Sequence, residues 1–416
     1  DSDFELCEQF HFHAARIRRL PAVAISPDFS PGAISVKVLL YAPQATNAMR
    51  HIVESFACEL ARHIEVVLYR PNTAGGLERG VGNPRLTLVQ FEASKSRMLR
   101  GLAHYNPIRQ YHEVARVRSL RPDLIHVFNG DGYLLPALAL RMIPAVPMMV
   151  TLHDPIPHPG DLIGSATTAL ARMMVVPRAA AIHVFAGVFR DHLCRHGASL
   201  ERVHVTRLGD IAEVFTRHDT SSVARENAAI LFGRLEHYKG IGVLVEAGLA
   251  LKARGKSRRV IIAGAGHLPR AMLRKILAHP DIFELHNRFI SEPEAAILLK
   301  RASTCVLPYL AATQSALPRI AQAYGQRIVA SRSGAFIEEI PLLGGTLVTP
   351  GSVEELADAL EDDRESGSLQ TPALDLYGWP GIADAMLTAY TSTIASFHNA
   401  AAKAGRASKP NEIRAA

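Results

Sequence analysis

Short apolar runs alternate with longer amphipathic stretches along most of this 416-residue chain. The first run is VKVLLY at residues 36–41, and the amphipathic stretch MRHIVESFACELARHI separates it from IEVVLY at residues 64–69. A continuous apolar run is typical of a strand that helices cover on both faces of a sheet. Further runs in the first half are residues 121–129, 146–154, 180–186 and 203–210. The first half therefore predicts a doubly wound, parallel α/β domain at residues 34–211.

A polar stretch at residues 212–227 has neither strand nor helix period, and it predicts a linker. The alternation then restarts, with helical stretches such as IGVLVEAGLALKARG and SVEELADALED between the apolar runs. These runs are residues 228–234, 258–266, 281–287, 303–309, 327–331 and 345–350. Because the rhythm of the first half is repeated, we expect a second Rossmann-like domain at residues 228–378.

The two ends of the chain lie outside these arrays. Residues 1–33 have no clear period and predict an N-terminal appendage without the apolar core of a signal peptide. Residues 379–400 predict one more amphipathic helix, and the basic, alanine-rich residues 401–416 predict a disordered tail. The most apolar stretch, residues 133–150, contains an arginine and three prolines, so we expect no transmembrane helix.

Composition narrows the classes of partner. Hydrophobic residues make up 48% and charged residues 20%, as in a globular protein, and the formal net charge of +7 favours anionic partners. Aromatic residues are only 6% and do not interleave with a basic stripe, which disfavours nucleic acid. The cysteines form no CxxC pair, which argues against a zinc ribbon or a disulfide scaffold and favours a cytoplasmic location. They are Cys7, Cys58, Cys194 and Cys305.

The segment ILFGRLEHYKG, residues 230–240, carries the first candidate chemistry. Ligands of parallel α/β sheets bind beyond the carboxyl ends of the strands. Here Gly233 makes a turn after a strand, and Arg234 and Lys239 precede a helix. Two cations at the entrance of a helix suit a pyrophosphate, although a solvated loop with incidental charges has the same composition.

The second candidate segment is ATQSA, residues 312–316, ahead of another expected helix. Free backbone N–H groups near Thr313, Gln314, Ser315 and Ala316 would bind a phosphate, with the serine adding its hydroxyl. The alternative is an ordinary serine cap of a helix.

Two more strand ends carry polar or glycine-rich loops. In TLHDPIPHPGD, His153 would hold a sugar or take a proton from an acceptor hydroxyl, or would simply bond to the backbone. A metal site formed with Asp154 and His158 is disfavoured by the two prolines of this loop and the lack of further ligands. In IIAGAGHLP, Gly264 and Gly266 begin a dinucleotide fingerprint without its third glycine, so they equally suit a loop that a nucleotide approaches closely.

Residues 36–398 resemble the group 1, family 4-like retaining glycosyltransferases of the GT-B fold. FGRLEHYKG is similar to the family's FxGRLxxxKG, and TLHD to its first-domain TxHD loop. ATQSA…AQAYGQRIVASRSGAFIEE resembles the ATQSG branch, and the helix that begins at Trp379 resembles the family's closing helix. The resemblance implies two Rossmann-like domains that face each other across a cleft, with the last helix crossing back onto the first domain.

The resemblance also implies a function. It implies a hexosyltransferase-like enzyme that moves a sugar from a UDP- or GDP-sugar to an acceptor hydroxyl with retention, using His153, Arg234 and Lys239 and no cofactor. The only DxD sequence is Asp1–Asp3, so we expect the cations to replace a metal. The acceptor would be a polysaccharide, a lipid-linked sugar or a small molecule, met at the inner face of a membrane if contact with a membrane occurs.

Departures from the family pattern keep a second class open. Aligned through Pro308 and Gly325, the positions of the family's E-x7-E carboxylates hold Ala312 and Ile320, and Ala311 replaces an acid of the ATQSG branch. The alternative is therefore a weak or inactive sugar-nucleotide-binding or scaffold protein on the same fold. An epimerase, a phosphorylase and an NAD enzyme are disfavoured.

Overall fold

The computed structural model describes residues 36–45, 48–94, 96–130, 132–156, 170, 172–256, 258–361 and 377–407. The predicted appendage at residues 1–33, His158 and Cys7 lie outside these ranges, and so do residues 408–416 of the predicted tail. Among the described residues, no helix is both long and apolar enough to cross a membrane.

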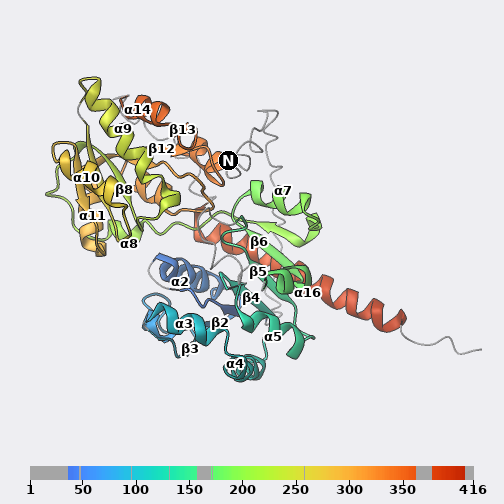
Figure 1. Ribbon diagram of the computed structural model, residues 1–416. Coiled ribbons are helices and arrows are strands. Elements are labelled where there is room, and N and C mark those ends of the chain that lie inside the picture. The colour runs from blue at the N-terminus through green and yellow to red at the C-terminus, as the bar shows by residue number, and fades with distance from the viewer. Residues whose placement is uncertain are drawn as a thin grey trace, which may run out of the picture. The chain divides into compact units, whose positions relative to one another are not determined.

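The first half of the chain forms a sheet of seven parallel strands in the order β3-β2-β1-β4-β5-β6-β7 (Figure 1, blue to green). The strands are β1 (Lys37–Tyr41), β2 (Glu65–Pro71), β3 (Leu86–Phe91), β4 (Leu124–Phe128), β5 (Met148–Thr151), β6 (Ala181–Val184) and β7 (Val203–Val205). The accompanying helices are α2 (Ala48–Leu60), α3 (Arg97–His104), α4 (Pro107–Ser119), α5 (Leu134–Met142) and α7 (Gly187–Arg195). The central strands β1 and β4 are almost fully buried because helices cover both of their faces.

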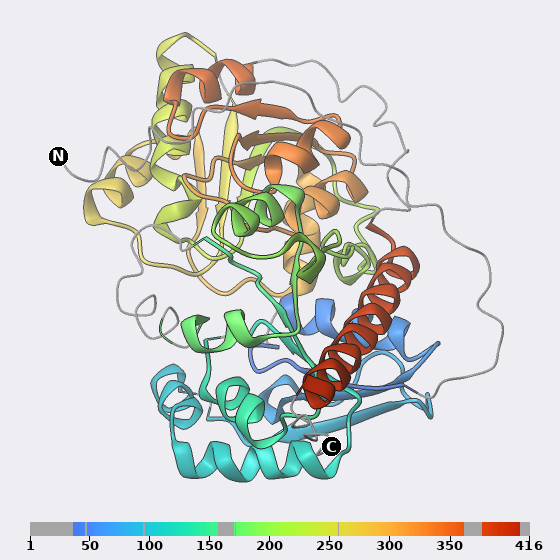
Figure 2. The same cartoon turned by 90° about the vertical axis from the view of Figure 1, so that its right-hand side faces the viewer.

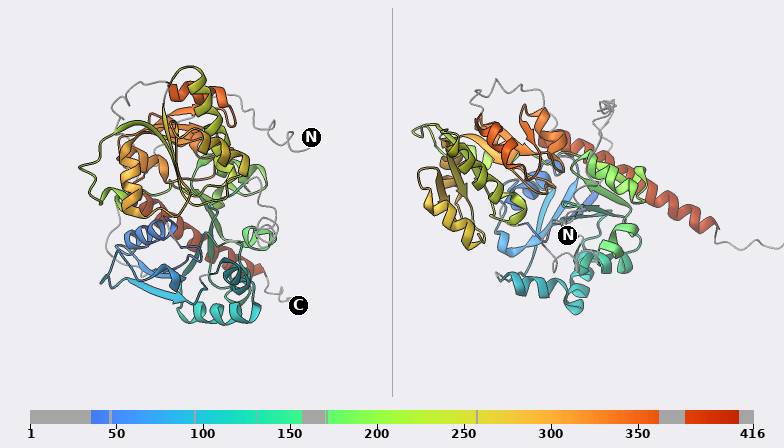
Figure 3. Two further views of the ribbon diagram at one scale, coloured as in Figure 1. Left: turned by 60° about the vertical axis from the view of Figure 1, so that its left-hand side comes forward. Right: turned by 45° about the horizontal axis from the view of Figure 1, so that its top comes forward.

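The second half forms a sheet of six parallel strands in the order β10-β9-β8-β11-β12-β13. The strands are β8 (Glu226–Phe232), β9 (Arg259–Ala263), β10 (Phe283–His286), β11 (Ala302–Leu307), β12 (Arg327–Ser331) and β13 (Thr346–Val348). The helices are α9 (Ile241–Ala253), α10 (Arg270–Ala278), α11 (Glu292–Arg301), α12 (Leu317–Ala323), α13 (Phe336–Leu342) and α14 (Val353–Glu361). Helices α9 and α14 lie side by side on this sheet (Figure 3). Both halves have the Rossmann-like order, so the predicted fold class is confirmed.

Several boundaries differ from the prediction. The edge strand β3 was missed, because residues 86–91 are only half-buried and carry polar residues. The predicted linker is not wholly irregular: α8 (Glu213–Thr216) lies within it, because Val214 and Phe215 are buried in the core. The final helix α16 (Trp379–Ala407) extends seven residues into the predicted tail.

Helix α16 packs against α2 (Figure 2). Its buried side chains include Ile382, Ala383, Met386, Ala389 and Tyr390, which recur at the spacing of one helix face. The last helix of the chain is therefore part of the core of the first array.

A chain of buried polar side chains runs across strands β4 to β7 beneath α16. His126 Nδ1 lies 2.6 Å from the Tyr390 hydroxyl, and His126 Nε2 lies 2.6 Å from Thr151 Oγ1. Thr151 Oγ1 lies 2.9 Å from His183 Nδ1, and His183 Nε2 lies 2.9 Å from Thr206 Oγ1. Burial lowers the pKa of His126 to about 3 and lowers that of His183 as well, so both imidazoles are neutral.

Candidate functional site

Two loops meet at the carboxyl ends of β8 and β11, the point where the strand order of the second sheet reverses. The first loop runs from Gly233 to Gly240, and the second runs from Tyr309 to Ala316. The Leu310 N–H donates to the Tyr238 carbonyl at 2.7 Å and ties the loops together. Two of the segments singled out in the sequence therefore lie beside each other.

Lys239 is the buried cation of this site, with only 8% of its surface exposed. Its ammonium donates to the Tyr309 hydroxyl at 2.9 Å and lies 4.9 Å from the centre of that ring. Among the described residues, no carboxylate lies within 4.0 Å of it. Burial lowers the pKa of Lys239, since a charged ammonium in this position loses its hydration.

Arg234 is placed differently from Lys239. Its side chain is 71% exposed and lies 3.6 Å from Glu236, a contact that is too loose to fix the guanidinium. The two cations are close enough for Arg234 to lower the pKa of Lys239. The predicted pair therefore consists of one fixed, buried charge and one solvent-exposed charge.

The ATQSA segment reaches the same point from the second loop. Burial raises the pKa of Tyr309, and a hydrogen bond with Ser315 opposes that shift, so Tyr309 links Lys239 to Ser315. Ser315 Oγ also accepts from the Leu317 N–H at 3.2 Å, which gives the serine its structural role as well. Ala316 precedes α12 in helical conformation.

Gln314 has an unusual environment within this segment. Its Nε2 is buried and has no hydrogen-bond partner among the described residues. Buried amide donors are almost always bonded, so this N–H group is available to a ligand or a water.

The glycines of the IIAGAG loop have a structural explanation. Gly264 has φ = +146°, and a Cβ there would lie 1.9 Å from the Gly233 carbonyl oxygen. A Cβ on Gly266 would lie 2.1 Å from the Leu235 carbonyl oxygen. The backbones of the two loops approach too closely for any side chain, which accounts for a GxG sequence without a dinucleotide.

His153 and Asp154, at the end of β5, meet the second array. His153 Nδ1 lies 3.3 Å from Asp154 Oδ1, which also accepts a hydrogen bond from Thr313. Because a carboxylate only accepts, Nδ1 of a neutral His153 carries the proton and Nε2 presents a lone pair. Nε2 has no partner among the described residues, and the ring packs against Phe185. The structure thus joins the TLHD loop to the ATQSA segment.

A further contact between the arrays was not predicted. Glu338 accepts from the backbone N–H groups of Gly187 and Val188 at 3.2 and 2.6 Å, and from Arg207 at 2.9 Å. A carboxylate at the start of α7 is favoured by the helix dipole. The IEE sequence was visible in the motif, but its partners lie more than 130 residues away in the chain.

The positions of the missing family carboxylates are apolar and buried. Ala312 is held by a hydrogen bond from its N–H to Ser333 Oγ at 3.0 Å, and Ile320 belongs to the core. Within the described ranges, no group of three or more His, Cys, Asp and Glu side chains is arranged to hold a metal ion.

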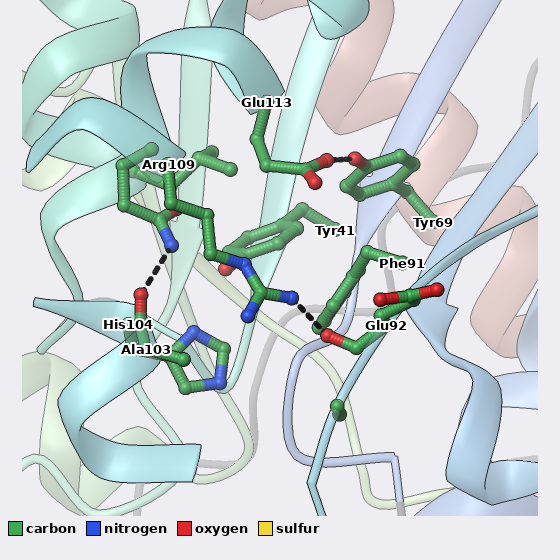
Figure 4. Close-up of a pocket in the computed structure, with 11 residues that line it drawn as sticks. Tyr41, Tyr69, Phe91, Glu92, Ala103, His104, Arg109 and Glu113 are labelled. Carbon is green, nitrogen blue, oxygen red and sulfur yellow. Dashed lines mark hydrogen bonds between the residues drawn. The ribbon is translucent and has the colours of Figure 1, made fainter. Parts of the chain in front are cut away.

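A pocket lies in the first array, between the carboxyl ends of β1 to β3 and helices α3 and α4 (Figure 4). Glu113 accepts from the Tyr69 hydroxyl there, and Arg109 donates to the Glu92 carbonyl. Burial raises the pKa of Glu113. Sequence reasoning assigned no role to these residues.

Comparisons with known proteins agree with this geometry. Residues 47–209 match the family model of the glycosyl transferase 4-like domain, and residues 226–362 match that of the glycosyl transferases group 1. The two matches follow each other and together take in most of the chain. Both α/β arrays of the chain therefore carry the signature of glycosyltransferase domains, the second array that of the group 1 glycosyltransferases.

Two curated relatives share 28% identity with parts of the chain. One is the amylovoran biosynthesis glycosyltransferase AmsK of Erwinia amylovora, matched over 42% of this chain and 44% of that protein. The other is the D-inositol 3-phosphate glycosyltransferase of Paenarthrobacter aurescens (strain TC1), matched over 49% and 55%. The chain spans about half the length of the curated relatives it matches.

Solved structures show the same fold. Anabaena Alr3699/HepE in complex with UDP and glucose is 17% identical, covers 86% of this chain and 100% of its own, and has a TM-score of 0.64. Sucrose-phosphate synthase from Thermosynechococcus elongatus is 15% identical, with coverage of 87% and 100% and a TM-score of 0.64. The two successive parallel α/β arrays of this chain therefore have the GT-B architecture.

Proposed function

We propose that the chain transfers a sugar from a UDP- or GDP-sugar to an acceptor hydroxyl, with Lys239 and Arg234 facing the diphosphate. The observation that carries the proposal is the buried Lys239 ammonium, whose partner is a neutral phenol and which has no carboxylate partner among the described residues. A buried charge without a counter-ion is costly, and a diphosphate would supply that counter-ion. The UDP in the Alr3699/HepE structure supports a uridine donor.

The same charge would assist the reaction. Negative charge accumulates on the β-phosphate as the glycosidic bond breaks, and a fixed cation at that position stabilises the transition state. Arg234 can move towards the donor because, in the described part of the chain, only a loose contact with Glu236 holds it. Gln314 Nε2 and the Ser315 hydroxyl would bind the donor beside it.

His153 would act at the sugar. Its unpartnered Nε2 lone pair accepts a hydrogen bond from a sugar hydroxyl, or takes the proton of the acceptor. Asp154 holds the ring through Nδ1 and is itself held by Thr313 of the second array. The proposal includes retention of configuration, as in the ATQSG branch, and independence of a metal.

Binding tests the core of this proposal. UDP, GDP and their sugar conjugates are titrated by calorimetry against the wild type, Lys239→Met and Arg234→Ala, with Lys252→Met as the control. Lys252 lies on α9 and pairs with Asp281, away from the site. We expect Lys239→Met to weaken binding of the matching nucleotide about 100-fold, as for a lost charge at a phosphate. Unchanged affinity in both site variants would refute the proposal, and circular dichroism checks that each variant is folded.

Two assays test the finer claims. Transfer should persist in EDTA, and restoration by a divalent ion after its loss would disprove metal independence. Proton NMR of the early product should show the anomeric configuration of the donor, and the opposite anomer would disprove retention.

The acceptor and the location are also part of the proposal. We infer a polysaccharide or lipid-linked acceptor and a cytoplasmic, peripheral position at a membrane, supported by the net charge of +7. The non-catalytic alternative is not favoured, because both family models and both curated relatives are glycosyltransferases.

A further inference from the structure

The phenol ring of Tyr309 is held in one place by its neighbours. Only 3% of Tyr309 is exposed, and its ring meets that of Tyr238 edge-on, with the ring centres 5.9 Å apart. The centre of the Phe336 ring lies 5.3 Å away. The Leu310 N–H donates to the Tyr238 carbonyl at 2.7 Å and fixes the backbone beside the ring. Because closely packed rings leave a side chain few alternative positions, this packing determines where the phenol oxygen lies.

The phenol oxygen in turn restrains the ammonium group of Lys239. The ammonium donates to it at 2.9 Å, and a Cβ at position 233 would lie 3.0 Å from the same nitrogen, so Gly233 leaves the room that the ammonium occupies. A lysine carries its charge on a flexible stem, which would otherwise allow the charge to move. Tyr309 on one side and the backbone of Gly233 on the other therefore confine a charge that the stem alone would not fix.

Packing does not explain the hydroxyl group of Tyr309. A phenylalanine in the same place would keep the ring contacts with Tyr238 and Phe336. The hydroxyl adds a buried oxygen that accepts a hydrogen bond from a charged donor, and such bonds are stronger than those between neutral groups. The phenol stays neutral, since burial raises its pKa. Tyr309 thus restrains the charge of Lys239 without neutralising it.

We propose that Tyr309 is a positioning residue, which sets the Lys239 ammonium where the diphosphate of the donor binds. A carboxylate in its place would compete with the phosphate oxygens for the ammonium, whereas a neutral phenol leaves the charge available to them. A side chain that is already ordered also reduces the entropy lost on binding. The inference rests on the proposed function for the identity of the ligand, and it adds a residue that acts on the ligand only through Lys239.

A double-mutant cycle tests this indirect action. UDP and GDP are titrated by calorimetry against the wild type, Tyr309→Phe, Lys239→Met and the double variant. We expect Tyr309→Phe to weaken binding of the matching nucleotide about tenfold, as for a lost hydrogen bond to a charged group. In the Lys239→Met background, the same substitution should weaken binding no further, because the group that it positions is gone.

Two further measurements separate positioning from damage to the fold. Uridine and guanosine have no phosphate, so their affinities, measured by ligand-observed NMR, should be equal in the wild type and in Tyr309→Phe. The second measurement is the affinity for the diphosphate from pH 7 to pH 10. Loss of the phenol oxygen removes an acceptor that stabilises the ammonium, so the pKa of Lys239 should fall further below its usual value. The decline of affinity at high pH should therefore begin about one pH unit lower in Tyr309→Phe. The other titratable groups that act on the ammonium stay in place, namely Tyr238, Arg234, Cys305 and Glu236.

The matched control is Tyr324→Phe, at the end of α12. The Tyr324 hydroxyl is buried and has no hydrogen-bond partner among the residues that the structure describes. This variant removes the same atom from a buried phenol, and it should leave the affinity for the nucleotide and its pH profile unchanged. Urea unfolding checks that both tyrosine variants are folded.

Three outcomes overturn the inference. They are wild-type affinity for the diphosphate in Tyr309→Phe, an equal loss of affinity for the nucleoside, and an equal further loss in the Lys239→Met background. An unchanged affinity in Lys239→Met itself would refute the proposed function as well. A loss in Lys239→Met without a loss in Tyr309→Phe would leave the proposed function intact and refute only the role of Tyr309.

Discussion

Glu339 on α13 is a carboxyl group that the fold keeps away from water. Its side chain is only 5% exposed. Burial raises its pKa to about 8, although Arg207 and Arg319 act in the opposite direction. Replacement by the isosteric, uncharged glutamine removes this titration.

The sign and the size of the effect follow from linkage. A glutamate in the unfolded chain has a pKa of about 4.3. Between that value and about 8, the native state binds a proton that the unfolded state releases, so stability falls as the pH rises. At pH 7 the accumulated cost is about 4 kcal/mol, which Glu339→Gln should restore.

Urea unfolding at intervals from pH 5 to pH 9 measures the effect. The single tryptophan, Trp379, donates to the Asp210 carbonyl at 2.8 Å, and Arg319 also binds Asp210. The fluorescence of Trp379 therefore reports on the neighbourhood of the substitution. The wild type should lose stability towards pH 8, and Glu339→Gln should show a flatter profile. Glu354→Gln, at an exposed position of α14, is the control and should follow the wild type. A Glu339→Gln profile with the wild-type slope would refute the reasoning.

Two further substitutions test packing. The carboxylate of Glu54 lies 2.7 Å from the buried guanidinium of Arg70, so Glu54→Ala leaves that charge without its counter-ion. The substitution should lower the free energy of unfolding in urea by about 3–5 kcal/mol. A loss below about 1 kcal/mol would contradict a buried ion pair. Gly264→Ala should cost about 3 kcal/mol in the same measurement, because its Cβ meets the Gly233 carbonyl at 1.9 Å. Gly255→Ala, with φ = +72° and nothing within 4 Å, is its control and should cost about 1 kcal/mol, so equal losses would disprove the close approach.

The alternation of apolar runs was sufficient to predict two Rossmann-like domains, because parallel strands covered on both faces leave a local signature. The same reasoning missed β3, whose edge position leaves residues such as Gln90 half-exposed. The local pattern of apolar and polar residues indicates which residues are buried. At the edge of a sheet or the end of a strand, however, burial depends on parts of the chain that are distant in sequence.

The candidate site shows the same limit. Position at a strand end was enough to single out Lys239 and Ser315, because the carboxyl ends of parallel strands converge. The phenol that joins them could not be predicted, because Tyr309 lies 70 residues from Lys239 in the chain. The exposure of Arg234 could not be predicted either, because it depends on which parts of the chain pack around the loop. The roles of the predicted site residues remain predictions.

The row of buried, hydrogen-bonded side chains beneath α16 allows only one assignment of donors and acceptors. The Thr206 hydroxyl donates to the Arg207 carbonyl, so it must accept from Nε2–H of His183, and the same rule passes through the threonine between the rings to His126. Tyr390 must then donate to His126 Nδ1. Each group therefore donates to the next one along the row, from Tyr390 on the last helix to the carbonyl of Arg207, whose guanidinium pairs with Glu338. The tautomer of His183 thus fixes the tautomer of His126, and neither imidazole can change its tautomer without the other.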